Sequence, residues 1–214
     1  LAGMGFFTSR KDKEAASALA AQDATIAEFW QWWSAEGRTA AAATFDGDRD
    51  DAALEQIAEK VGAFAEQLEL GFEFGRGRTA AHVLVFTPAG DPSVTAVADR
   101  WLAAAPAADA AFEYDSRRRA VENPAGIGIR FGEHSFEIGD MLLVSEPHGD
   151  RIDVHVWHPA FAEAPREVGG NVTFLVLDAL LGEQVVEDRI GEVRFDRELG
   201  PEARPLLELR DLLG

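Results

Sequence analysis

The clearest alternation of apolar and polar positions lies between residues 141 and 158. Residues 141–146 form a short apolar run, and the following turn contains Gly149, which can adopt the positive φ of a tight reversal. The next segment alternates, with Ile152, Val154 and Val156 on one side and Asp153, His155 and Trp157 on the other. A period of two predicts a strand with unlike faces. We therefore expect 141–146 and 151–158 to pair as an antiparallel hairpin, which Pro159 ends.

A helix and a third strand are expected next. Residues 171–182 are mostly apolar, and they are bounded by Asn171, a suitable N-cap, and Gly182, a common helix end. Phe174 and Leu177 are expected to face the core. Asn171, Asp178 and Gly182 share one stripe, which we interpret as the exposed side of the helix; the alternative is a buried and functional Asp178. Residues 192–195 form the last strand of this ββαβ unit.

Residues 70–116 repeat the same order of elements. A hairpin turns near residues 75–77 and ends at Pro88, Asp91-Pro92 begins a helix that contains Trp101, and Phe112 and Tyr114 alternate in a following strand. The chain is therefore predicted to be an α+β protein with antiparallel sheets flanked by helices. A duplicated ββαβ plan, related to the ferredoxin-like folds, would make residues 69–117 superpose on 141–196. The alternative is a chance similarity of two common units.

This pattern divides the chain into three stretches. Residues 1–50 would hold an N-terminal helix and a connection, residues 51–120 the first unit with a helix before it, and residues 121–214 the second unit with a C-terminal helix. We expect the three stretches to form one compact domain.

The N-terminal helix carries an aromatic face. Leu19, Ile26, Phe29, Trp30 and Trp33 recur at helical spacing within residues 11–36. Such a face is typical of a helix packed over a sheet. Trp32 lies off this face, and it is the residue of the cluster that we assign to contact with a partner.

Composition and charge exclude several kinds of chemistry. The chain has no cysteine, so disulfides, thiolate nucleophiles and cysteine-ligated metal sites are excluded. The formal net charge of −18 repels nucleic acids and anionic membranes, and no apolar run approaches the roughly 20 residues of a membrane span. Three Lys against seventeen Arg, amid many Ala, indicate a GC-rich bacterial genome. We expect a cytoplasmic bacterial protein that binds neither nucleic acid nor membrane.

The hairpin at 141–158 holds the candidate chemistry. Asp153 and His155 share a strand face and could chelate a divalent ion or act as a base and its orienting acid. A third ligand would have to come from Glu146 or His134. A polar, solvated strand face explains the same residues. The three arginines 117–119 are interpreted as a solvated loop.

Several short motifs resemble an uncharacterised family of bacterial proteins. They are Phe29-Trp30-x-Trp32-Trp33, Ala103-Ala-Ala-Pro106, Leu175-x-Leu177-Asp178-x-x-Leu181-Gly182-Glu183 and Ile190-Gly191. The resemblance implies an α+β protein with no known activity, and it carries over no functional residues.

The absence of a recognised catalytic motif favours a non-catalytic interaction or regulatory module. Its partner would be another protein, a homo-oligomer is allowed, and no cofactor is expected. The alternative is a metal-assisted hydrolase with Asp153 and His155 at its centre.

Overall fold

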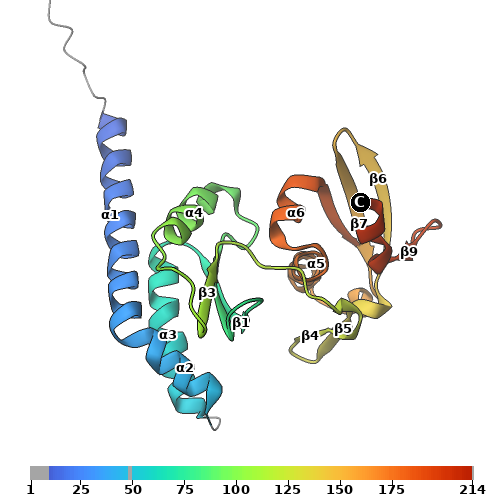
Figure 1. Cartoon of the computed structure of the whole chain (residues 1–214). Helices are drawn as coiled ribbons and strands as arrows, with labels where there is room; N and C mark the ends of the chain where they lie inside the picture. The colour runs from blue at the N-terminus through green and yellow to red at the C-terminus, as the bar shows by residue number, and fades with distance from the viewer. Residues whose placement is uncertain (1–9, 48–49, 214) are drawn as a thin grey trace, which may run out of the picture. The chain divides into compact units, whose positions relative to one another are not determined.

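The computed structural model describes residues 10–47 and 50–213 (Figure 1). Contacts divide the chain into two compact units, Leu1–Ser116 (unit 1) and Arg117–Gly214 (unit 2). Each unit has its own hydrophobic core. Both combine helices with small sheets, which confirms the α+β fold class. The division between the units falls four residues before the boundary expected after residue 120.

Unit 1 combines a three-stranded sheet with α-helices. Strand β2 lies in the centre, antiparallel to β1 and parallel to β3, and α4 forms the crossover between β2 and β3. The elements are α1 (Arg10–Trp32), α2 (Arg38–Asp46), α3 (Asp51–Gln67), β1 (Gly71–Arg76), β2 (His82–Thr87), α4 (Thr95–Ala103) and β3 (Phe112–Asp115).

Aromatic side chains dominate the core of unit 1. Trp101 is fully buried, and its ring stacks on Phe86 with centroids 4.3 Å apart. The Trp30 indole N–H donates to the carbonyl of Trp101 at 2.9 Å, and Phe29 contacts both Trp rings. Helix α1 is thus fixed to α4 by ring packing and by one buried hydrogen bond. The expected burial of Trp30, Trp33, Phe64 and Trp101 is confirmed.

Only the second half of α1 takes part in this packing. Residues 10–21, here called the exposed arm, are all exposed, and Figure 1 shows this part of the helix standing clear of the rest of unit 1. Arg100 of α4 donates to Gln22 and Asp23, directly after the arm. The buried stripe begins at Ile26.

The expected connection after residue 36 is wrong, because the chain stays helical up to Asp46. A π-helical turn, Trp33–Gly37, joins α1 to α2. A Cβ at position 37 would lie 2.8 Å from Cη2 of Trp32 and 2.9 Å from Cε3 of Trp33. Glycine therefore allows both indoles to pack against the joint, and the alanines that follow favour helix.

Unit 2 is built around a four-stranded sheet in the order β8-β7-β6-β9, with a separate β4–β5 hairpin. Strands β6 and β7 are antiparallel, and β7 and β8 are parallel. The elements are β4 (Gly128–Phe131), β5 (His134–Glu137), β6 (Leu142–His148), β7 (Arg151–Trp157), α5 (Arg166–Leu181), α6 (Glu183–Arg189), β8 (Ile190–Asp196), β9 (Arg204–Pro205) and α7 (Leu209–Leu213).

The two units share a topology. In each, an antiparallel hairpin is followed by a helical crossover to a third strand that is parallel to the second, so β1-β2-β3 corresponds to β6-β7-β8. The antiparallel hairpin predicted at 141–158 is confirmed. Descent by duplication, and a ferredoxin-like relationship, remain predictions.

The helix of unit 2 differs from the expectation. It begins at Arg166, directly after Pro165, and not at an Asn171 cap. Gly169 lies inside this helix. A Cβ at position 169 would be 2.7 Å from the ring of Phe195, so glycine leaves room for that ring. The expected burial of Phe174 is wrong: its side chain is 45% exposed. Phe174 lies two positions from both Val172 and Val176, which face the core, so it points to the other side of the helix.

Among the described residues, no helix is both long and apolar enough to cross a lipid bilayer.

Replacement of Trp101 by Ala is expected to lower the free energy of unfolding by about 3–5 kcal/mol, since it empties a fully buried site. Phe174→Ala, which also truncates an aromatic ring but at an exposed site, is the control and should cost less than ~1 kcal/mol. Denaturant unfolding measures both variants. Equal losses would contradict the assignment of Trp101 to the core.

Candidate functional site

The polar face of the β6–β7 hairpin is occupied by contacts within unit 2. Both carboxylate oxygens of Asp153 have partners: Oδ1 accepts the Glu192 N–H at 2.7 Å, and Oδ2 lies 2.9 Å from Nδ1 of His148. The β7–β8 register shifts between Ile152 and Val154, so Asp153 sits at a β-bulge. Its side chain therefore satisfies a backbone donor that the irregular ladder would leave unpaired.

Gly191 is part of this arrangement. A Cβ at position 191 would collide with Oδ1 of Asp153. Glycine thus allows the carboxylate to approach the backbone of β8 closely.

The other candidate residues do not join Asp153 in one site. Nδ1 of His155 lies 3.4 Å from Oδ2 of Asp196, and Glu146 is exposed opposite Asp153 in the β6–β7 register. The face therefore has two acid–imidazole pairs, His148–Asp153 and His155–Asp196, in place of the expected Asp153–His155 pair. In residues 10–47 and 50–213, no group of three His, Asp or Glu side chains is arranged to hold a metal ion.

The electrostatics of Asp153 favour a structural role. The hydrogen bond from the Glu192 N–H, followed by the contact with His148, lowers the pKa of the Asp153 carboxyl below its ordinary value. A lowered pKa makes the carboxylate a weaker base at neutral pH. The His148 imidazole is largely exposed, and the Asp153 carboxylate orients it.

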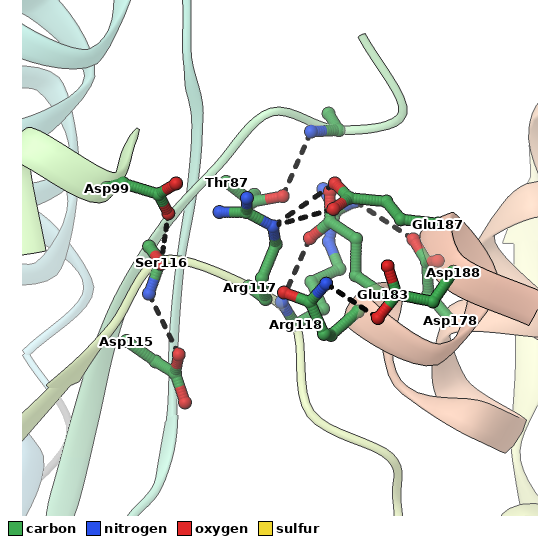
Figure 2. A network of polar contacts seen from close by, with 12 residues as sticks. Thr87, Asp99, Asp115, Ser116, Arg117, Arg118, Asp178, Glu183, Glu187 and Asp188 are labelled. Carbon is green, nitrogen blue, oxygen red and sulfur yellow. Dashed lines mark hydrogen bonds and ion pairs between the residues drawn. The ribbon is translucent and has the colours of Figure 1, made fainter. Parts of the chain in front are cut away.

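A second polar cluster lies where α5 meets α6. Figure 2 shows Arg117 and Arg118 among carboxylates of these two helices. Nε of Arg117 lies 3.1 Å from both carboxylate oxygens of Glu187, and Nη1 of Arg118 lies 3.3 Å from Oδ2 of Asp178. The expectation of a solvated arginine loop is wrong here, because Arg117 is buried and Arg118 is largely covered.

Backbone contacts complete this cluster. The Arg118 N–H donates to Oε2 of the buried Glu183 at 2.9 Å, and the Glu183 N–H donates to the carbonyl of Arg118, also at 2.9 Å. Gly182 has φ +85°, and a Cβ there would lie 3.1 Å from the nitrogen of Ala120. The segment at the start of unit 2 therefore holds the α5–α6 junction in place through Arg118 and Ala120.

Asp178 belongs to this second polar cluster. It is 5% exposed, so its assignment to the exposed stripe is wrong. Burial of a carboxylate is costly unless it is paired, and Arg118 supplies the pair. A spacing pattern within one helix could not show that an arginine 60 residues earlier covers this position.

His158 is a buried imidazole with one unsatisfied nitrogen. Nδ1 accepts the Ala160 N–H at 3.1 Å, whereas Nε2 has no hydrogen-bond partner among the described residues. Its ring packs against Phe136 and Phe161. Desolvation lowers the pKa of His158 below its ordinary value, although the charges of Asp140 and Glu137 act in the opposite direction.

Trp32, the residue singled out for partner contact, is half-buried. Its ring stacks on Phe64 at 5.9 Å, and the Lys60 ammonium lies 5.8 Å from its centroid. These contacts assign Trp32 to the edge of the unit 1 core.

Asp153→Ala is expected to lower the melting temperature, because Glu192 loses the acceptor for its N–H. Asp153→Asn keeps a carbonyl oxygen there and should melt closer to wild type. Neither zinc nor manganese should raise the melting temperature of wild type or of either variant. Differential scanning fluorimetry with and without each ion measures this, and an ion-dependent rise in wild type that both variants lose would favour the hydrolase alternative.

His158 should make the protein less stable in mild acid. Its folded-state pKa is lowered, so the unfolded chain takes up the proton first, and stability falls as pH drops below the ordinary value of 6.5. His158→Asn keeps an acceptor for Ala160 and removes this titration, so its stability should fall less between pH 7 and 5. Denaturant melts across this range measure the difference. Parallel pH profiles for variant and wild type would contradict the prediction.

Comparisons of the chain with protein-family models, with curated proteins and with solved structures found no match. The resemblance to an uncharacterised bacterial family therefore remains a prediction.

Proposed function

We propose that the protein is a non-catalytic interaction module whose docking element is the exposed arm of α1. One observation carries the proposal: each residue from 10 to 21 is exposed, although the helix continues without a break into the core of unit 1. The arm carries the large apolar side chain of Leu19, which is 45% exposed.

The apolar stripe of the core continues onto the arm. Leu19 lies seven residues, close to two helical turns, before the buried Ile26, which in turn precedes the buried Trp33 by seven. Leu19 and Ile26 therefore share a face, with Ala15 one turn earlier. Packing against unit 1 covers this stripe only from Ile26 onward, so Ala15 and Leu19 are its uncovered end.

Helix energetics support a partner for the arm. A segment of twelve residues without tertiary contacts depends on intrinsic propensity and on the nucleus that the buried half of α1 supplies. Alanine favours helix, but pairing with a second apolar stripe would hold the arm far more firmly.

The charges favour a second copy of the chain as that partner. Arg10, Lys11 and Lys13 outweigh Asp12 and Glu14, so the arm carries +1, and the remainder of the −18 chain carries −19. Two copies would repel each other over most of their surfaces and least along their arms. We infer homotypic pairing through the Ala15–Leu19 stripe.

The metal-assisted hydrolase is the less supported alternative. The exposed His148–Asp153 pair favours it, but both oxygens of Asp153 already have partners in unit 2.

Wild type should be a dimer that dissociates on dilution, since two short arms bury less surface than the ~1,200 Å² of a standard stable interface. Leu19→Glu places a charge on the stripe and should give a monomer. Light scattering coupled to size-exclusion chromatography, over a range of loading concentrations, measures the mass.

Ser17→Glu is the matched control. It adds the same charge to the same arm, two residues away and nearly on the opposite side of the helix, so it should leave the dimer intact. A wild-type monomer at every concentration, or equal dissociation in both variants, would overturn homotypic pairing.

A further inference from the structure

We propose that unit 2 binds a small aliphatic carboxylate in a cavity beside the C-terminal turn of α5. The cavity measures about 430 Å³, within the ~300–1,000 Å³ of small-molecule sites. Its lining comes from α5, α6, α7 and the segment at Ala120. It is independent of the arm and of the hairpin face.

Five of the eight residues that line the cavity are apolar. Leu180 and Leu181 of α5, Val185 of α6 and Leu213 of α7 line it. Val185 is 36% exposed, so one wall is open to solvent. These side chains would cover an alkyl chain.

Two arginines give the cavity its charge. Arg210 donates Nε–H to the carbonyl of Leu180 at 2.6 Å and an Nη2–H to the carbonyl of Val121 at 2.5 Å. Carbonyl partners orient the guanidinium without neutralising it, and three of its five N–H groups remain. Arg189 also lines the cavity, and its side chain has no hydrogen bond or ion pair with any residue in the described part of the chain.

The remaining charged group in the lining is Asp188, whose Oδ2 accepts from Gln184 at 3.0 Å. Two cations and one carboxylate leave a charge of +1 in a chain that carries −18 overall. A single carboxylate on an apolar tail matches this arrangement, because guanidinium groups bind carboxylates in their own plane. A phosphate with two charges would meet Asp188 at close range.

Octanoate is the probe, titrated by isothermal calorimetry into the full chain. Acetate tests the charge alone and octanol the tail alone, and both should bind at least ~10-fold more weakly than octanoate, since each loses one of the two interactions. Octanol binding as tightly as octanoate, or no heat with octanoate at millimolar concentration, would overturn the proposal.

Variants locate the binding. Arg189→Gln removes an exposed cation from the cavity and should weaken octanoate binding at least ~10-fold. Val185→Asp puts a carboxylate on the open wall and should abolish it. Arg130→Gln makes the same charge change on β4, outside the cavity, and should leave the affinity unchanged. Equal loss in Arg189→Gln and Arg130→Gln would show general charge attraction and contradict a site here.

Discussion

The packing of α1 into an aromatic core is the constraint on which the rest of unit 1 depends. Phe29, Trp30 and Trp33 contact rings from α3, α4 and all three strands, and Trp30 also donates a hydrogen bond to α4. Such rings bury large areas and prefer defined geometries. The helix is therefore held in one orientation by its second half.

That orientation has a consequence for the first half. Because α1 is continuous, the chain must project residues 10–21 along the helix axis, where no described element of unit 1 covers them. A protein that needed α1 only for its core could begin the helix near Gln22, where Arg100 makes its first contact. The additional turns, with Leu19 in line with the core stripe, are what an interaction module would add.

In unit 2 the acidic side chains that invite a catalytic interpretation are used to build the fold. Asp153 satisfies the backbone at a β-bulge, and Asp178 and Glu183 hold Arg118 across a helix junction. Their partners within unit 2 hold these carboxylates in place. Arg189 and Arg210 differ, because neither forms an ion pair with a carboxylate in residues 10–47 or 50–213.

The fold was predictable wherever one chain segment determines its own structure. Alternation specified the β6–β7 hairpin, and helical spacing placed Trp33 and Trp101 in the core. The errors lie where distant segments meet. Asp178 is buried because Arg118 covers it, and Asp153 accepts from the Glu192 N–H because of a bulge between strands.

Trp32 and the arm are further positions at which the sequence alone could not show burial. Trp32 and Trp33 are the same residue type and differ only in whether the core covers their side of the helix. Leu19 was assigned to the buried face by its spacing, and that assignment is wrong because the other elements of unit 1 cover this face only from Ile26 onward. Spacing shows which face is apolar, but only the tertiary structure shows how far along the helix that face is covered.

Hydrogen exchange along α1 tests the central claim most directly. Amides of residues 14–21, which follow the first turn of the helix, should be protected at high protein concentration and should lose that protection on dilution or in Leu19→Glu, because pairing stabilises the arm. Residues 26–32 are the internal reference and should stay protected under all conditions, since the core covers them. Arm amides that exchange equally fast at every concentration would contradict the account.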